Sequence, residues 1–279
     1  MSTETENLAE TIRLKSIHVY PIKSLAGNWC EKAQVEKQGV KGDRLFMLVD
    51  ENGVFISQRI YPQLALLSVQ TQQNKLIVKA KNGEHLTINR NDFTPTNQVF
   101  NLWREKVNAK LATAEVNQFF SDYLNKKVSL VQYDQQQPRT TDPRFSNADD
   151  IVSFADGFPL LLLNQASLDD LNQRLEKPVS MQNFRGNLII EGAQAFAEDH
   201  WKKIRIGDIE FDLVKPCSRC VMTTVDPKTG IVSATTQPLK TLAKFRKTKQ
   251  GIMFGINLIP RSLGKIKVGD KLEVTQFNN

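Results

Sequence analysis

The sequence is poor in cysteine, histidine and long hydrophobic runs, and each shortage excludes a class of protein. Three cysteines in 279 residues cannot supply the disulfide framework of a small secreted protein. The three histidines are scattered and show no paired spacing of the kind that zinc proteins use. The longest apolar run, FPLLLL at 158–163, is far shorter than the roughly 20 residues that a membrane helix needs. We therefore expect a globular protein without a membrane anchor, in which this run is a core element.

The sequence also lacks the common phosphate-binding loops, because neither GxGxxG nor GxxxxGK followed by Ser or Thr occurs. Nothing therefore indicates a nucleotide-binding fold. The first residues, MSTETENLAETIRLKS, are acidic and polar where a signal or transit peptide is basic and apolar. We expect a short disordered tail over residues 1–11 and a cytoplasmic location.

Positive charge is concentrated in the last third of the chain. Residues 202–272 hold 15 Lys/Arg and 5 Asp/Glu, a net charge of +10, whereas the whole chain has a net charge of +7. This concentration favours an anionic ligand near the segment. Nucleic acid is the alternative, but the only dense basic run, KFRKTKQ at 244–250, carries one aromatic residue and is typical of a solvated surface. We expect no nucleic-acid partner.

Strand patterns dominate the chain, with a few helices between them. Asn-Gly pairs at 52–53 and 82–83 predict hairpin turns, and apolar residues at helical spacing predict a helix over 111–125. Further strands are predicted at 12–22, 44–57, 75–89, 187–192, 203–214, 221–226, 251–260 and 265–276, and a short helix at 238–247. The fold class is therefore mixed α/β but β-rich, and a barrel or strongly curved sheet is favoured over a doubly wound fold.

Residues 135–150, QQQPRTTDPRFSNADD, divide the chain into two parts. The segment is polar, contains two prolines and has no hydrophobic periodicity. Long segments of this kind are linkers or loops that serve a site. We expect an antiparallel β domain over 12–134 and a second β-rich domain over 151–279.

Two cysteines separated by two residues mark the segment 214–231, VKPCSRCVMTTVDPKTGI. A redox dithiol normally opens a helix, whereas Cys220 leads into VMTTVD, a strand pattern. Structural zinc needs further ligands, and Cys30 and the histidines offer none at a suitable spacing. Two small, half-buried cysteines without a function are a further alternative. The flanking Lys215 and Arg219 favour a thiolate, which is the form that binds metals.

Seven segments, in chain order, match one known family. They are VYPIKSLAG (19–27), GDRLFMLVD (42–50), SFADGFPLLLLNQASLDDLN (153–172), NFRGNLII (183–190), PCSRCVMTTVDPKTG (216–230), FGINLI (254–259) and IKVGD (266–270). With them the chain resembles, nearly end to end, the MOSC-domain proteins of the branch that contains the bacterial YcbX-type proteins and the mitochondrial amidoxime-reducing component. The resemblance implies an N-terminal MOSC β-barrel-like domain over 12–134, a linker or site loop over 135–150, and a MOSC β-barrel domain over 151–279.

The resemblance implies a molybdenum cofactor, a pterin dithiolene with a phosphate, and no pyridoxal phosphate. One protein cysteine ligates the metal, and the family pattern assigns this role to Cys220, with Cys217 as its neighbour; a soft thiolate suits molybdenum. Relatives often have Ser-Asp-Thr where this chain has Ala-Asp-Gly at 155–157, so only the aspartate keeps a polar side chain there. The implied cofactor contacts are Lys23, Ser24, Arg44, Asp156, Arg185, Asn187, Ser218, Arg219 and Asn257.

Two of these contacts have simpler alternatives. Lys23 is also compatible with an ordinary exposed lysine. Arg44 is also compatible with a salt bridge to Asp43, although neighbouring residues on a strand point to opposite faces, which argues against that pair.

The resemblance implies a reductase of N-hydroxylated compounds such as amidoximes, hydroxylamines and N-hydroxylated bases, with Cys220 as the catalytic metal ligand. YcbX-type relatives carry a C-terminal 2Fe–2S ferredoxin domain, whereas this chain ends at VTQFNN without four clustered cysteines. We therefore expect electrons from a separate ferredoxin- or flavodoxin-like protein with its reductase. The alternative is a carrier of molybdenum cofactor or of sulfur, with a persulfide on Cys220. A domain that has lost its cofactor and serves as a binding module is a third possibility.

Overall fold

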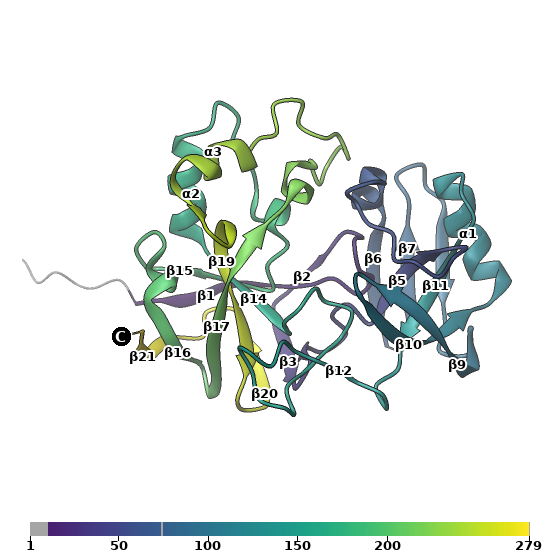
Figure 1. Cartoon of the computed structure of the whole chain (residues 1–279), viewed down its shortest axis with the longest axis horizontal. Helices are drawn as coiled ribbons and strands as arrows, with labels where there is room; N and C mark the ends of the chain where they lie inside the picture. Colours follow the sequence, from purple (N-terminus) through teal and green to yellow (C-terminus); the bar gives the residue numbers. More distant parts are fainter. Residues whose placement is uncertain (1–10, 74, 279) are drawn as a thin grey trace, which may run out of the picture.

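The computed structural model describes residues 11–73 and 75–278 and consists of two β-rich bodies side by side (Figure 1). The first body holds the strands from β5 to β11, and the second holds β1 to β4 together with the strands that follow residue 150. The predicted disordered tail, residues 1–11, lies outside the described residues except for Thr11. The β-rich mixed fold class is confirmed.

A nine-stranded mixed sheet forms the centre of the second body. Its order is β2-β1-β15-β14-β19-β17-β16-β21, with β18 paired to β19. Only β14 and β15 run parallel, and the other pairs are antiparallel. The strands are β1 (Arg13–Val19), β2 (Asn28–Cys30), β14 (Leu160–Asn164), β15 (Leu188–Glu191), β16 (Trp201–Ile206), β17 (Ile209–Arg219), β18 (Lys247–Thr248), β19 (Gly251–Pro260) and β21 (Leu272–Phe277).

The nine-stranded sheet curls strongly but does not close. Leu14 N donates to Asp270 O at 2.9 Å and Leu272 N donates to Ile12 O at 2.8 Å, so one end of the sheet approaches the other. Pairing there stops at the isolated bridge between Arg13 and Lys271. A closed barrel needs a continuous ladder between its first and last strands, so the expectation of a closed barrel is wrong for the described strands, whereas that of a strongly curved sheet is confirmed.

The run LLLL in β14 is buried on both faces of the sheet, as its continuous hydrophobicity requires. Leu160 and Leu162 pack with the core cluster on one face. Leu161 and Leu163 pack with the cluster on the other face, because successive side chains of a strand point in opposite directions. The second cluster is covered by α2 (Gln165–Gln173), α3 (Leu239–Phe245) and the 3-10 turns η2 (Met181–Phe184) and η3 (Ala197–His200).

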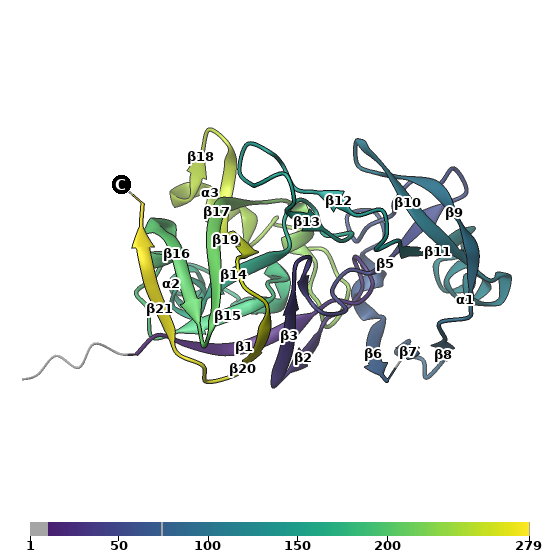
Figure 2. The ribbon, with the colours of Figure 1, turned by 90° about the horizontal axis from the view of Figure 1, so that it is seen from below.

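Two small sheets extend the second body. The order β20-β3-β4 joins β20 (Gly264–Lys267) to β3 (Lys32–Glu36) and β4 (Gly39–Val40), so the start and the end of the chain pair directly. The segment 135–150 contributes β12 (Arg139–Thr140), which pairs with β13 (Ile151–Val152) and lies between the two bodies (Figure 2). Residues 13–40 thus contribute to sheets of the second body, while the domain division at 135–150 stays a prediction.

The first body contains two antiparallel sheets and one helix. One sheet has the order β5-β11-β10-β9 and the other β6-β7-β8. Both predicted Asn-Gly turns are present, because Val49 bridges to Phe55 around the first and β7 pairs with β8 around the second. The elements are β5 (Phe46–Asp50), η1 (Pro62–Leu66), β6 (Ser68–Gln72), β7 (Lys75–Lys79), β8 (His85–Ile88), β9 (Phe93–Leu102), β10 (Glu105–Ala112), α1 (Ala114–Leu124) and β11 (Val128–Tyr133).

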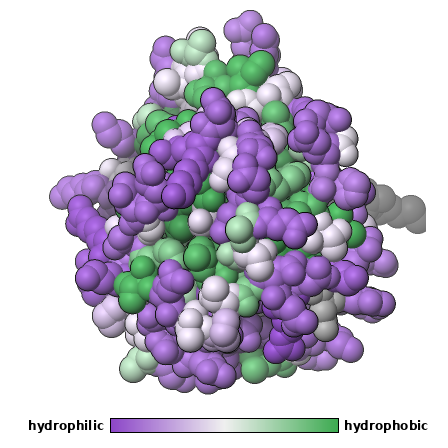
Figure 3. Space-filling model, turned by 90° about the vertical axis from the view of Figure 1, so that its right-hand side faces the viewer, coloured by the Kyte–Doolittle hydropathy of each residue, from purple (hydrophilic) through white to green (hydrophobic). Residues whose placement is uncertain are grey.

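Helix α1 covers the core of the first body. Its Val116, Phe120 and Leu124 are buried one above the other at i, i+4 and i+8. The helix begins at Ala114 and not at Leu111 as predicted, because Leu111 pairs with Val131 in the sheet. The surface of this body that faces the viewer in Figure 3 is mostly hydrophilic, with small separate hydrophobic patches. No helix in the described ranges is long and apolar enough to cross a bilayer.

The strand predicted at 221–226 is wrong, because the 3-10 turn η4 (Val221–Thr224) stands there. Thr223 Oγ1 donates to Cys220 O at 2.9 Å and Thr224 Oγ1 donates to Val221 O at 2.7 Å. Threonine side chains that bond to nearby carbonyls offer the backbone an alternative to a strand ladder. The chain therefore turns sharply directly after Cys220.

Candidate functional site

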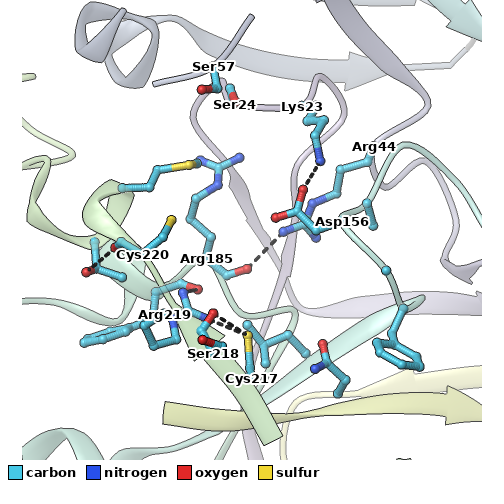
Figure 4. A pocket seen from close by; sticks show the side chains of 18 of the residues that line it. Lys23, Ser24, Arg44, Ser57, Asp156, Arg185, Cys217, Ser218, Arg219 and Cys220 are labelled. Carbon is cyan, nitrogen blue, oxygen red and sulfur yellow. Dashed lines mark hydrogen bonds and ion pairs between the residues drawn. The ribbon is translucent and has the colours of Figure 1, made fainter. Parts of the chain in front are cut away.

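A pocket between the two bodies collects all the residues predicted to bind the cofactor or the metal (Figure 4). Cys217 to Cys220 lie along the end of β17, Lys23 and Asp156 lie across the pocket from them, and Arg185 lies between. The predicted residues that line it are Lys23, Ser24, Arg44, Asp156, Arg185, Asn187, Ser218, Arg219, Cys220 and Asn257. We call Arg44, Arg185, Asn187, Arg219 and Cys220 the floor of the pocket, and Phe55, Arg59 and Trp103, which also line it, the rim.

The two cysteines of the CxxC segment stand where β17 ends. Both are free, half-buried and line the pocket. Cys220 is the N-cap residue of η4, so the pairing of β17 with β19 has stopped at its position. Opposite this segment Gly251 has φ +130°, a conformation that favours glycine, and a Cβ there would meet the side chain of Ser218.

Arg219 binds the neighbouring protein groups and keeps one donor unused. Its Nη1 donates to Cys217 Sγ at 2.9 Å and its Nη2 donates to Phe184 O at 2.5 Å. Its Nε is buried and has no hydrogen-bond partner among the described residues. An unpaired buried donor is costly, so this nitrogen fits an acceptor that a ligand would bring.

Arg44 is held by three acceptors. It donates to Asp43 Oδ2 at 2.5 Å, to Asn187 Oδ1 at 3.0 Å and to Arg185 O at 3.0 Å. The argument against the salt bridge with Asp43 is therefore wrong. Arg44 has φ 48° and precedes β5, so the alternation of a strand does not apply to it. The Asn187 amide also donates to His18 O and accepts from Leu161 N, so its own position is fixed by two strands. Its bond to Arg44 therefore positions the guanidinium group.

Tyr20 brings two of the three arginines of the floor, Arg44 and Arg185, to one aromatic ring. The guanidinium carbons of Arg44 and Arg185 lie 4.4 and 4.3 Å from its ring centroid, within the range of cation–π attraction. The ring is 3% exposed, and burial raises the pKa of its hydroxyl. Tyr20 therefore offers both cations a neutral π-face inside the protein.

Lys23 is buried, since only 7% of the residue is accessible. The alternative that it is an ordinary exposed lysine is therefore wrong. Its ammonium forms an ion pair with Asp156 and lies 5.0 Å from the ring centroid of Phe55. Burial lowers the pKa of Lys23, and Asp156 partly offsets this. The partial loss of bulk water inside the pocket would alone raise the pKa of Asp156, but the charge of Lys23 and hydrogen bonds from Lys23 and Trp103 hold it below its usual range. The Asp156 side chain is 69% exposed, because it faces the open pocket.

Positive charge exceeds negative charge around the pocket. Four cationic side chains line it where the sequence predicted them, and Asp43 and Asp156 pair with two of these. Burial lowers the pKa of Arg185 to about 10, which is the effect expected when a cation is desolvated without its own carboxylate. An anionic ligand would compensate this charge.

Asn257, another predicted cofactor contact, lies in β19 and bonds to the neighbouring strand β17. Its Nδ2 donates to Lys215 O at 2.9 Å, so it ties β19 to β17 beside the pocket. Cys30 lies in β2 and its Sγ is directed to Ile17 O at 3.8 Å, and it does not line the pocket. In the described part of the chain, no three His, Cys, Asp or Glu residues form a cluster that could hold a metal.

Sequence reasoning missed Tyr20 and the rim. Tyr20 stands inside the motif VYPIKS, so its position next to Lys23 was an available signal. Phe55 follows the first Asn-Gly turn, and Trp103 stands at a hairpin turn that contains no glycine. A large aromatic residue at such a turn is unusual, and this was the only sequence signal for the rim.

Comparisons with known proteins match both halves of the chain. Residues 11–127 match the family described as the MOSC N-terminal beta barrel domain, and residues 149–273 match the MOSC domain. Mitochondrial amidoxime reducing component 2 of Bos taurus is 31% identical over 277 residues, which is 92% of this chain and 81% of that one. The protein of the same name from Homo sapiens is 32% identical and covers 90% and 80%. Molybdenum cofactor sulfurase of Arabidopsis thaliana is 28% identical over 87% of this chain but only 32% of its own length.

Proposed function

The chain belongs to the family of MOSC-domain proteins with an N-terminal MOSC β-barrel domain, and from this membership we propose that it binds a molybdenum cofactor and reduces N-hydroxylated compounds. The names of the relatives from Bos taurus and Homo sapiens supply the reaction class. For an amidoxime, two electrons and two protons convert the N–OH group to N–H and release water.

The observation that carries the proposal is a free, half-buried thiol in a pocket with excess positive charge. Cys220 lines the same cavity as Arg44, Arg185 and Arg219, and the Nε of Arg219 is buried without a hydrogen-bond partner among the described residues. A pterin dithiolene with a phosphate is anionic and its metal accepts a soft thiolate. The donor set therefore fits this group.

We assign the residues of the pocket to parts of the cofactor by their chemistry. Cys220 would ligate the metal. The cationic side chains Lys23, Arg44, Arg185 and Arg219 would hold the anionic groups, and Arg forks suit phosphate and heteroatom edges. Ser24, Asp156, Ser218 and Asn257 would supply polar contacts, and Asn187 would support Arg44. The bound cofactor supplies the two-electron chemistry, while the protein positions it and limits the access of water.

Electrons are proposed to come from a separate ferredoxin- or flavodoxin-like protein with its reductase. A cytoplasmic location accompanies this proposal as a prediction from the sequence alone. Neither statement depends on the geometry of the pocket.

The second candidate is a carrier of the cofactor or of sulfur, with a persulfide on Cys220. It is favoured by the similarity to the Arabidopsis thaliana molybdenum cofactor sulfurase, which extends over most of this chain. The half-buried thiol of Cys220 is accessible enough to carry a sulfur atom. The reductase is preferred because a persulfide carrier has no need of four cationic side chains around the thiol.

The proposal is tested by measuring molybdenum content and amidoxime reduction with a chemical reductant, in wild type, Cys220→Ala and Cys217→Ala. We expect Cys220→Ala to lose metal and activity by more than the roughly 10- to 100-fold typical of residues that only support a ligand. Cys217→Ala, the matched control, should keep both. If loaded wild type reduces no N-hydroxylated compound but transfers sulfur or cofactor, the carrier is correct. Loss of metal in Cys217→Ala would overturn the assignment of a single ligand.

A further inference from the structure

Trp103 has a backbone conformation that its side chain makes unfavourable. Leu102 pairs with Glu105, so Trp103 and Arg104 form a two-residue turn between β9 and β10, and Trp103 has φ 58°. Such turns normally place glycine, asparagine or aspartate at positive φ. Backbone strain of this kind persists only where the surroundings hold it, and it clusters at ligand sites.

Three partners hold the indole ring of Trp103. Its Nε1 donates to Asp156 Oδ1 at 3.1 Å. The ring meets Phe55 edge to face at a centroid distance of 5.2 Å, and the guanidinium carbon of Arg59 lies 4.4 Å from the ring centroid. The ring is thus fixed in direction by contacts to two separate segments of the chain, residues 55–59 and the loop that carries Asp156.

Trp103 is nevertheless 45% exposed, although it lines the pocket. A tryptophan that served only to pack the two bodies together would be expected to hide more of its surface. Its indole therefore presents apolar area at the boundary between pocket and solvent. The Lys23 ammonium, which belongs to the polar part of the pocket, is 5.9 Å from the ring centroid.

We propose that Trp103 determines substrate specificity, because its indole stacks on the flat ring of an aromatic N-hydroxylated substrate. This inference rests on the proposed function and adds to it a substrate class and a residue. The substrate ring lies against the exposed part of the indole, and the N-hydroxylated group enters the pocket. Offset stacking of two aromatic rings adds attraction that a saturated ring of equal size cannot give.

The test compares two amidoximes with six-membered rings, benzamidoxime, whose ring is flat and aromatic, and cyclohexanecarboxamidoxime, whose ring is saturated. Cofactor-loaded wild type, Trp103→Phe and Trp103→Leu are assayed for KM and kcat, and binding of both compounds is measured by calorimetry. We expect Trp103→Leu to raise KM and Kd for benzamidoxime about 3- to 10-fold and to leave those for the cyclohexyl compound unchanged. Trp103→Phe should restore most of the loss, and kcat should change little.

The inference is overturned if Trp103→Leu changes KM for both compounds equally, or for neither. Molybdenum content and circular dichroism of the three proteins establish that pocket and fold are intact. If cofactor-loaded wild type reduces neither amidoxime, the proposed function fails. Calorimetry then still tests whether Trp103 binds the aromatic ring. Benzamidoxime that binds more weakly to Trp103→Leu would then support the stacking role, and equal binding would contradict it.

Discussion

The floor of the pocket is built into buried structure, whereas its rim is carried by loops of the first body. Asn187 is 1% exposed and bonds to β1, β14 and Arg44 at once. Arg59 and Trp103 are exposed, and both lie outside the strands. The two regions face the same cavity but differ in how firmly the rest of the chain fixes them.

This difference follows from what each region must hold. Four cationic side chains repel one another in a buried pocket, so a rigid scaffold of paired strands and shared acceptors is needed to keep them together. A rim that touches a substrate needs only surface and orientation. We therefore expect substitutions under the floor to affect cofactor retention most, and substitutions in the first body to spare it.

Apart from loss of the Cys220 ligand, the largest expected effect comes from the core beneath the floor. Phe184 is fully buried, stacks on Phe254 at a centroid distance of 4.1 Å, and offers the carbonyl that Arg219 binds. Phe184→Leu should lower the free energy of unfolding by about 1–2 kcal/mol. It should also lower molybdenum retention about tenfold, the equivalent of about 1.4 kcal/mol, because the Arg219 guanidinium loses the Phe184 ring, whose centroid lies 5.5 Å away, and the segment that leads to Arg185 loses its packing.

The matched control is Phe120→Leu in α1, since Phe120 is equally buried but belongs to the core of the first body. We expect a similar loss of stability in urea unfolding and unchanged molybdenum content. Equal loss of molybdenum in both variants would break the distinction between floor and rim.

The parts of the fold that depend on local sequence patterns were the predictable ones. The run FPLLLL and the Asn-Gly turns depend on local patterns, and strands and turns occur where these patterns indicated. The 3-10 turn after Cys220 was missed because VMTTVD has strand-like residues, while the hydroxyls of Thr223 and Thr224 bond to the backbone. A β-branched residue favours a strand only where no such local bond competes.

Long-range pairings were not predictable from local patterns. Nothing in the sequence near β1 indicates that it pairs with β15, or that β3 pairs with β20. The floor residues were nevertheless named, because the family resemblance links distant segments. The rim residues lie outside all seven matching segments, so neither the resemblance nor a local pattern identified Trp103 or Arg59.

A smaller effect is expected from Tyr20, which tests whether the floor arginines are positioned by its ring. Tyr20→Leu removes both cation–π contacts, each worth about 0.5–2 kcal/mol, and should weaken binding of inorganic phosphate by the cofactor-free protein. Tyr20→Phe should bind phosphate as wild type does, because the hydroxyl makes only a long bond of 3.4 Å to Gly186 O. Calorimetry in low salt measures both. Weaker binding by Tyr20→Phe would assign the role to the hydroxyl and not to the ring.

The smallest effect, and one of opposite sign, is expected where floor and rim meet at Asp156. Its carboxylate pairs with Lys23 and would repel an arriving phosphate, so Asp156→Asn should strengthen inorganic phosphate binding about two- to fivefold, while the amide oxygen still accepts from Trp103. The pKa of Asp156 lies below its usual range, so the pair with Lys23 is present above the ordinary pKa of an aspartate and is lost only as pH falls through the lowered value. Asp156 therefore stays ionised from pH 5 to pH 8, so a change in the ratio of the two affinities over this range reports the titration of phosphate and not that of Asp156. Weaker phosphate binding by Asp156→Asn would show that Asp156 itself helps to hold the anion.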